Sequence, residues 1–295
     1  MDGVLLIDKP AGLTSHDVVA RIRRSSRESR VGHTGTLDPR ATGLLPLVLG
    51  RATRLASRIT AGTKTYHAMI RLGFATDTDD ADGQPIGETK TVRADRAIVE
   101  QVLAAFRGTF EQTPPAHSAK KVGGRKAYEL ARRSEPVSLA PVTVTVHSLA
   151  LTTCESDLVG VEVTASTGFY VRALARDLGE RLECGGHLAE LRRTSCAGFD
   201  ISGAVALDTA EREMTGLAAR LISPMEALPH LPAVEVSPTG LARIRNGSAI
   251  GPEHLASRAL PSPGAGEVRL TGPEGALFAL AHSRGGALHP VLVLG

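Results

Sequence analysis

Apolar and polar residues alternate over residues 64 to 72, 142 to 146 and 159 to 165 of this 295-residue chain. A period of two is typical of β-strands that bury one face. In the first stretch Tyr66, Ala68, Ile70 and Leu72 share a face, and a lone tyrosine in such a row is usually a core residue. We therefore predict a sheet assembled from several half-buried strands.

Helical signals lie between these stretches. Thr14 or Ser15 can cap a helix that continues past residue 22. Residues 95 to 107 place Ile98 and three further apolar residues at helical spacing, and residues 172 to 182 carry a leucine at every fourth position from Leu174. The chain is therefore expected to mix helices and strands.

The composition changes near residue 228. Beyond it the chain contains no lysine, has prolines at positions 229, 232 and 238, and shows only short strand-like runs. A chain of this length forms one large domain or two unequal ones. We predict one domain over residues 1–227 and a small β-rich domain over residues 228–295, in which residues 262–266 are a flexible interruption.

The three cysteines, Cys154, Cys184 and Cys196, are far apart and form no Cys-x-x-Cys pair. This spacing argues against a disulfide framework and against structural zinc, so we expect no metal. The longest apolar run, residues 44 to 49, is too short for a membrane span, and the first residues lack the apolar core of a signal peptide. These features favour a cytoplasmic protein.

One short segment, residues 31 to 43, places Asp38 among glycines and hydroxyl side chains. Pro39 restricts the backbone on both sides of the peptide bond that it shares with Asp38. Taken alone, an Asp-Pro pair in such a loop is most often a turn, although a fixed carboxylate also suits a catalytic site.

Positive charge is clustered, although the formal net charge is only +3. Five arginines lie between residues 21 and 30. An insertion at about residues 111–137 combines Gly123, Gly124 and Tyr128 with six cations, namely Lys120, Lys121, Arg125, Lys126, Arg132 and Arg133. Such a segment suits a clamp on a phosphate backbone, and an ordinary basic surface loop is the alternative.

Residues 77 to 83 contain four aspartates and a glycine, which suggests a calcium loop. If Gly83 takes the sixth position of such a loop, Thr78 falls on the first position and Thr89 on the twelfth. Neither is the carboxylate that calcium requires, so we reject this interpretation.

Several motifs occur in a fixed order along the chain: GVLLIDKPAGLTS (3–15), residues 31–43, KTY (64–66), LGFATDTDDADG (72–83), residues 114–132, GFYVRALARDLG (168–179) and LRRT (191–194). Together they resemble the bacterial tRNA pseudouridine-55 synthase family, which isomerises a uridine in the T loop of tRNA. The resemblance implies an α+β fold with a mixed, mostly antiparallel sheet and flanking helices, followed by a small PUA-like RNA-binding domain. Arg40 and Phe169 depart from the usual leucine and threonine of the family.

The resemblance also implies which residues form the site. Asp38 matches the catalytic aspartate, Tyr66 the tyrosine beneath the target base, and Arg172 the arginine that pairs with the aspartate. The expected substrate-binding residues are His33, Tyr170, Leu191, Lys9 and Lys64. The expected contacts with the RNA backbone are Lys120, Lys121, Arg125, Lys126, Arg192 and Arg193.

The reaction exchanges an N1–C1′ bond for a C5–C1′ bond and changes no atoms, so no cofactor is expected. Asp38 can attack C1′ or C6, or remove the C2′ proton, and the sequence leaves these three open. A nearby guanidinium would keep the carboxylate charged, which suits Arg172. The target base must leave its stack, and Tyr66 can replace the lost stacking.

The expected partner is the T arm of tRNA, bound by a monomer without membrane, guide RNA or obligate protein partner. One alternative is a tRNA-folding chaperone whose catalysis is secondary. Another is a glycosidase, but glycosidases ordinarily need two carboxylates and the loop offers only Asp38.

Overall fold

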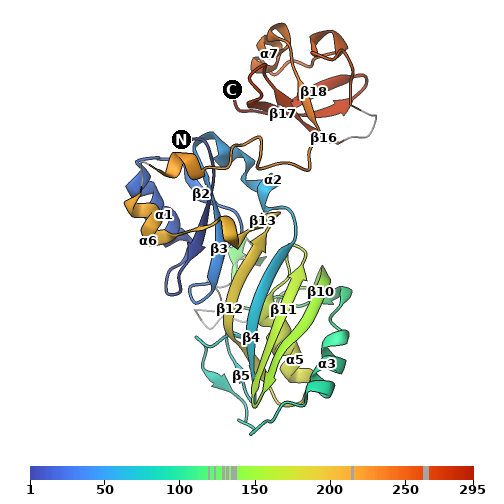
Figure 1. Ribbon diagram of the computed structural model, residues 1–295. Coiled ribbons are helices and arrows are strands. Elements are labelled where there is room, and N and C mark those ends of the chain that lie inside the picture. The colour runs from blue at the N-terminus through green and yellow to red at the C-terminus, as the bar shows by residue number, and fades with distance from the viewer. Residues whose placement is uncertain are drawn as a thin grey trace.

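The computed structural model describes residues 1–118, 120–122, 124–127, 130, 133, 138–213, 216–261 and 266–295. Figure 1 shows an elongated molecule in which a long twisted sheet carries helices at its sides and a small module sits at one end. The predicted α+β fold with a mixed sheet is confirmed.

Eight strands follow one another across the large sheet. In sheet order they are β14 (Val205–Ala206), β1 (Gly3–Lys9), β3 (Thr42–Leu49), β12 (Gly186–Cys196), β4 (Lys64–Leu72), β11 (Leu158–Ala165), β10 (Val142–Glu155) and β7 (Gly108–Gln112). Two more, β2 (Val31–His33) and β13 (Phe199–Asp200), pair with β3 and β12. Neighbours are antiparallel except for the β1–β14 and β3–β12 pairs.

The parallel contact between β3 and β12, which we term the seam, joins the two halves of the sheet. It consists of two register pairs, Arg192 with Thr42 and Arg193 with Gly43. Gly43 has a φ of 97°, and a Cβ there would lie 2.2 Å from the carbonyl oxygen of Arg193. Only glycine allows the two backbones to approach this closely.

Helices pack against both halves of the sheet. Beside β1 lie α1 (Ser15–Ser26), whose N-cap Thr14 forms a capping box with Asp17, and α6 (Leu207–Arg212). On the other half α5 (Val171–Arg181) packs on β12, and α3 (Arg96–Ala104) contacts α5 and β10 (Figure 1). Ile98 of α3 is exposed and Val99 is buried instead, whereas Leu103 and Phe106 of the predicted apolar face are buried.

The C-terminal module is a four-stranded sheet with its own core. Its order is β15 (Ala233–Glu235), β16 (Glu267–Thr271), β17 (Leu277–Arg284) and β18 (Ala287–Val293), with helix α7 (Pro238–Arg245) alongside. Nine buried apolar residues of the module form a separate cluster. The predicted boundary between residues 227 and 228 stays a prediction.

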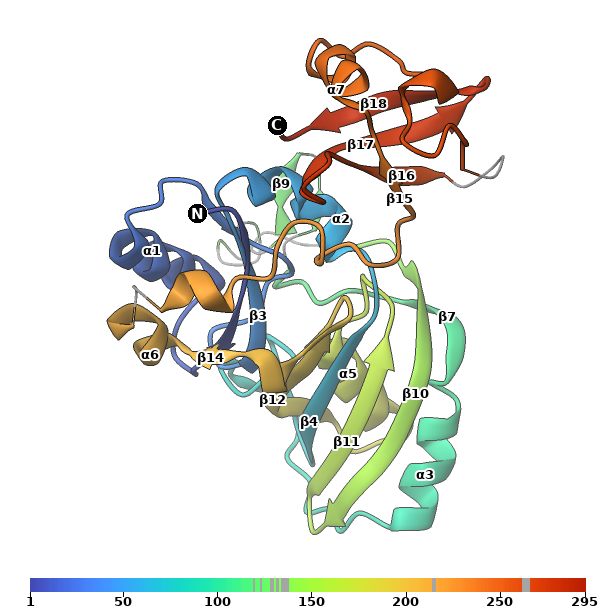
Figure 2. The ribbon, with the colours of Figure 1, turned by 45° about the horizontal axis from the view of Figure 1, so that its top comes forward.

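The module also packs on the large domain, above helix α2 (Ala56–Thr60) in Figure 2. Leu280 and Leu294 share an apolar cluster with β1 and β3. Arg58 of α2 forms an ion pair with Glu267 of β16, with 2.9 Å between Nη2 and Oε1.

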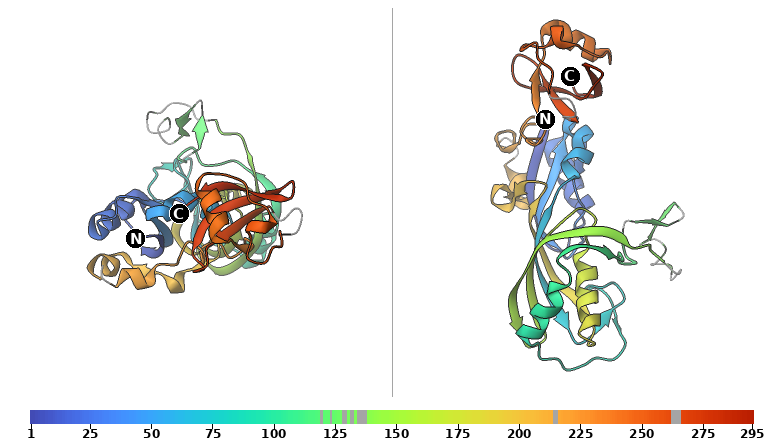
Figure 3. Two further views of the ribbon diagram at one scale, coloured as in Figure 1. Left: turned by 90° about the horizontal axis from the view of Figure 1, so that it is seen from above. Right: turned by 90° about the vertical axis from the view of Figure 1, so that its right-hand side faces the viewer.

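The predicted insertion contains a short hairpin, β8 (Lys121–Val122) and β9 (Arg125–Lys126). Figure 3 shows this green hairpin away from the main sheet. Gly123, Tyr128, Arg132 and residues 262–265, which carried sequence predictions, lie outside the described residues.

Candidate active site

Asp38 lies in the loop between β2 and β3, beside the seam. Its Oδ2 is 3.0 Å from Nε of Arg172, the second residue of α5. The side chain of Asp38 is 43% exposed, whereas that of Arg172 is 7% exposed. The carboxylate therefore faces solvent while its partner is buried behind it.

The Arg172 guanidinium has further partners that fix its plane. Nη1 donates to the carbonyl oxygen of Thr78 at 3.1 Å, and Nη2 donates to that of His117 at 2.9 Å. The carboxylate of Asp80 lies 3.6 Å from Nη1. A planar donor held in this way presents a defined edge to Asp38, which a lysine could not do.

The buried Lys9 holds the backbone of the Asp38 loop through hydrogen bonds. The ammonium of Lys9 donates to the carbonyl oxygens of Pro10, Leu13 and Pro39 at 2.9, 2.6 and 3.1 Å. Burial lowers the pKa of Lys9 to about 8, although the nearby charge of Asp38 opposes this shift. In this structure the side chain of Lys9 is fully buried and fixes the backbone next to Asp38, and its expected contact with substrate stays a prediction.

Arg193 is also fully buried. Its Nε donates to the carbonyl oxygen of Leu44 at 2.8 Å and its Nη2 to that of Gly35 at 2.9 Å. In this structure the side chain points inward and holds the ends of the Asp38 loop, and its expected contact with an RNA backbone stays a prediction. Arg192 is exposed and pairs with Asp8 at 2.7 Å.

Two tyrosines border this region. Tyr66 is buried in β4, and burial raises its pKa although Arg193 opposes the shift. Tyr170 precedes α5, where Gln112 accepts a hydrogen bond from its backbone nitrogen and donates one to its carbonyl oxygen. Burial also raises the pKa of Tyr170, so both phenols keep their protons at neutral pH.

His33 ends β2 with its ring edge-on to His16, the centroids 5.6 Å apart. Burial and the neighbouring His16 lower the pKa of His33, which favours the neutral ring. Among the described residues, no side chain or backbone group pairs with the buried Nδ1 of His33.

A hollow beside Asp38 is lined by Asp80, Arg172 and residues 188–191, with Arg40 and Ala41 at its rim. Leu191, an expected substrate-binding residue, is part of this lining. The volume of about 20 Å³ accommodates roughly one water molecule. In this structure the hollow is smaller than a nucleotide base.

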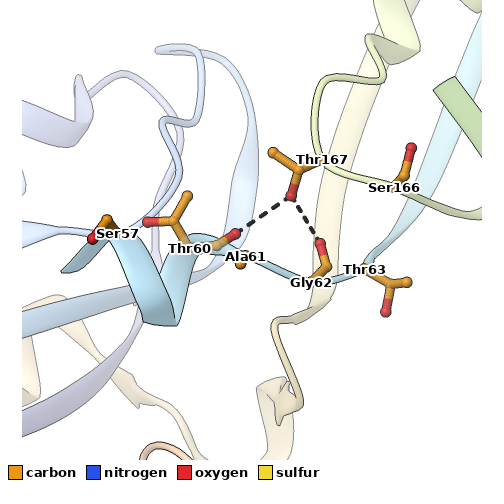
Figure 4. Close-up of a pocket in the computed structure, with 7 residues that line it drawn as sticks. All are labelled: Ser57, Thr60, Ala61, Gly62, Thr63, Ser166 and Thr167. Carbon is orange, nitrogen blue, oxygen red and sulfur yellow. Dashed lines mark hydrogen bonds between the residues drawn. The ribbon is translucent and has the colours of Figure 1, made fainter. Parts of the chain in front are cut away.

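A larger hollow of about 500 Å³ lies between α2 and the loop before α5 (Figure 4). Hydroxyl groups and backbone line it, and the Thr167 hydroxyl donates to the carbonyl oxygen of Gly62 at 2.9 Å. Lys64 donates to that hydroxyl at 3.0 Å and is itself buried. Because no carboxylate lines this hollow, we place the chemistry at Asp38 instead.

Comparison with known proteins identifies the family. A family model described as TruB family pseudouridylate synthase (N terminal domain) matches residues 23–171, and one described as tRNA pseudouridylate synthase B C-terminal domain matches residues 172–228. The chain belongs to the TruB family of pseudouridylate synthases. The two models meet at Arg172, the partner of Asp38.

Relatives within this family match nearly the whole chain. The tRNA pseudouridine synthase B of Thermobifida fusca is 42% identical over 99% of this chain and 98% of its own length. That of Solibacter usitatus is 45% identical over 84% of this chain and 85% of its own. A solved Cbf5-Nop10-Gar1 complex contains a chain with a TM-score of 0.75 at 24% identity, covering 99% of this chain and 85% of that one, which shows a common fold.

The sequence did not reveal every residue of this candidate site. Asp80 lies in the motif of residues 72–83 and in the rejected calcium loop but was not assigned to the site, and its position near Arg172 depends on a turn that docks on β12. The RNA-backbone roles of Lys120, Lys121, Arg125 and Lys126 stay predictions.

No helix among the described residues is both long and apolar enough to cross a membrane. Within the same residues, no group of three or more His, Cys, Asp or Glu side chains is arranged to hold a metal ion.

Proposed function

We propose that this chain converts a uridine of tRNA, in the T loop at position 55, to pseudouridine. The observation that carries the proposal is the pairing of an accessible carboxylate, Asp38, with a buried guanidinium, Arg172. The names of the curated relatives support tRNA as the substrate.

Asp38 acts on the nucleotide as an anion. The Arg172 guanidinium stabilises that charge and fixes the carboxylate on the open side of the loop. Three routes are consistent with this geometry: attack at C1′, attack at C6, and removal of the C2′ proton. In each route the N1–C1′ bond breaks, the uracil turns, and C5 bonds to C1′. The C5 proton then leaves and N1 takes up a proton, so no atoms are gained or lost.

The uridine must be extruded from the folded T loop to reach Asp38. Unstacking costs a few kcal/mol, which stacking on an aromatic ring offsets in part. Tyr66 is the residue that we assign to this stacking. Tyr170 and Leu191 close the pocket around the base, and His33 fills the position that the base leaves.

We further propose that the chain acts on tRNA as a monomer without guide RNA or protein partner. We assign the contacts with the RNA backbone to Arg192 and to the cations in and beside the β8–β9 hairpin, Lys120, Lys121, Arg125 and Lys126. Phosphate contacts of this kind position an RNA, while the pocket selects the base.

The test replaces Asp38 with Asn and measures pseudouridine in unmodified tRNA by carbodiimide-dependent stops of reverse transcription. We expect the stop at the T-loop uridine to disappear, while the Kd for tRNA changes by less than about threefold, because Asn preserves the shape of the side chain. Wild-type stops in this variant would refute the role of Asp38.

Asp82→Asn is the matched control. Asp82 is an exposed aspartate that pairs with Arg40 at 3.2 Å, close to the site but not against Arg172. This variant should retain the stop. A T-arm substrate with cytidine at the target position should give no stop with either protein.

A further inference from the structure

A second arginine lies one turn along α5 from Arg172. Arg176 pairs through Nη1 with Oδ2 of Asp79 at 3.0 Å and through Nη2 with Oδ1 of Asp177 at 2.8 Å. Its Nη2 also donates to the carbonyl oxygen of Thr113 at 3.0 Å. The side chains of Arg176 and Asp79 are only 21% and 14% exposed, so this is a largely buried pair.

The two arginines bind the same two segments. In residues 78–80, Arg172 contacts Thr78 and Asp80, and Arg176 contacts Asp79. In residues 113–117, Arg176 binds the carbonyl oxygen of Thr113 and Arg172 that of His117. Arg176 therefore anchors, from outside the pocket, both segments that hold Arg172.

The turn that carries Asp79 is in an unfavourable backbone conformation. Asp79 has a φ of 61°, in the left-handed region that favours glycine. The backbone nitrogen of Asp79 donates to the carbonyl oxygen of Thr76, and the backbone nitrogen of Leu188 donates to the carbonyl oxygen of Asp79. The second hydrogen bond docks the turn on β12. The ion pair with Arg176 is the side-chain contact that holds Asp79 in this conformation.

We propose that Arg176 and Asp79 are positioning residues for the isomerisation: their ion pair fixes the 78–80 turn and residue 113 so that Arg172 holds Asp38 in its reactive orientation. The inference rests on the proposed function, since it concerns the rate of that reaction. Neither residue faces the hollow beside Asp38, so neither is expected to touch the uridine.

An ion pair with only a structural role would be expected to stabilise the fold at neutral pH. Burial raises the pKa of Asp79 to about 6, despite the opposing attraction of Arg176 and Arg172. An acid whose pKa is raised on folding stabilises the fold when protonated, and this contribution is lost as the pH rises through 6. At pH 7 the charged form of Asp79 therefore costs stability relative to the protonated form.

The test uses Asp79→Asn and Arg176→Gln, measured by single-turnover pseudouridine formation on tRNA at pH 7. We expect each rate to fall about 10-fold, because a small misplacement of a reacting group is costly. The Kd for tRNA should stay within about twofold of wild type, and Asp79→Asn should melt at the same temperature or higher. The double variant should be no slower than either single variant, because both disrupt the same contact.

The pH profile gives an independent readout. Asp79 is surrounded by Arg176 and Arg172, with Asp177 and Asp80 as the nearby acids. The wild-type rate should fall as the pH drops through about 6, where Asp79 takes up a proton and its attraction to Arg176 weakens. Asp79→Asn, which has no such proton to gain, should lack that part of the profile.

Asp177→Asn is the matched control, because it removes a carboxylate from the same guanidinium without altering the 78–80 turn. We expect its rate to equal that of wild type. Equal losses in Asp177→Asn and Asp79→Asn, or wild-type rates in Asp79→Asn and Arg176→Gln, would overturn the positioning role while leaving the proposed function intact. A wild-type protein that forms no pseudouridine would overturn both.

Discussion

Two buried cations, Lys9 and Arg193, control the backbone around Asp38 without contacting its carboxylate in this structure. Both direct their donors at carbonyl oxygens, Lys9 at Pro39 and Arg193 at Gly35 and Leu44. A buried charge is costly unless hydrogen bonds compensate it. Here the compensation comes from the backbone of the catalytic loop, so the loop and the charges stabilise one another.

Lys9→Met tests this arrangement, because methionine fills similar space and donates no hydrogen bond. Unpaired buried acceptors cost about 1–3 kcal/mol each, so we expect a free energy of unfolding at least about 2 kcal/mol lower at pH 7. The rate of pseudouridine formation should fall as well, since Pro39 is then free to move beside Asp38. Urea unfolding and a single-turnover assay measure the two effects.

The same variant has a defined pH dependence. Because the pKa of Lys9 falls from 10.5 to about 8 on folding, the unfolded chain binds more protons than the folded one between these values. Stability from this group therefore rises with pH in that window. The difference in free energy of unfolding between wild type and Lys9→Met should widen from pH 8 to pH 10, and a constant difference would contradict the assignment.

At the scale of elements, the seam between β3 and β12 is the most constrained contact. The Asp38 loop ends at Thr42, where this contact begins, and Arg193 on the opposite strand reaches back to the loop. The geometry of the loop therefore depends on how closely the two strands approach.

Gly43→Ala should disrupt that approach. The new Cβ would lie 2.2 Å from a carbonyl oxygen of β12, at a φ of 97°. We expect a loss of more than about 3 kcal/mol in urea unfolding, together with loss of activity. Gly198→Ala is the control: Gly198 also has a positive φ but no atom near its Cβ position, so backbone strain alone should cost about 1–2 kcal/mol.

The elements differ in how far the sequence predicted them. Strands β4, β10 and β11 follow from alternation because each buries one face. Strand β12 was not predicted, because its register with β4 shifts at Leu188 and again at Arg193, which breaks the alternation.

The residues of the site also differ in how far the sequence predicted them. The pairing of Asp38 with Arg172 was implied by motifs. The burial of Lys9 and Arg193 was not, since a charged residue is exposed by default. The spacing of Arg172 and Arg176 by four residues was a visible signal, but their partners come from distant turns that only the fold brings together.

At the scale of the whole molecule, the C-terminal module folds around its own core and also packs on the large domain. It has its own core, but Leu280 and Leu294 pack with β1 and β3, and Arg58 reaches Glu267. An apolar contact combined with a partly buried ion pair keeps the module in one orientation on the large domain. An RNA that contacted both parts would bind a surface whose two parts are already fixed relative to each other.

Arg58→Gln removes the ion pair while leaving the apolar contact. A partly buried pair of this kind contributes roughly 1 kcal/mol or less, so the melting temperature should change little. Amide exchange should nevertheless become faster in β16 and α2, measured by mass spectrometry. Arg71→Gln, which breaks an exposed pair with Asp157 inside the large domain, is the control and should leave exchange in β16 unchanged. Unaltered exchange in Arg58→Gln would show that the remaining contacts, the apolar cluster and the hydrogen bonds from Arg51 and Arg54 to carbonyl oxygens of the module, suffice to fix it.

The seam has a consequence for the order in which the protein is made. Arg193 and Leu44, which meet there, are 149 positions apart in the chain, and closing so long a loop delays a contact relative to local hairpins. During synthesis the loop with Asp38 emerges early but has no fixed geometry until β12 has been translated and has inserted beside β3. We therefore expect a chain truncated before β12 to form no pseudouridine, so that activity would indicate that the two halves of the sheet have joined.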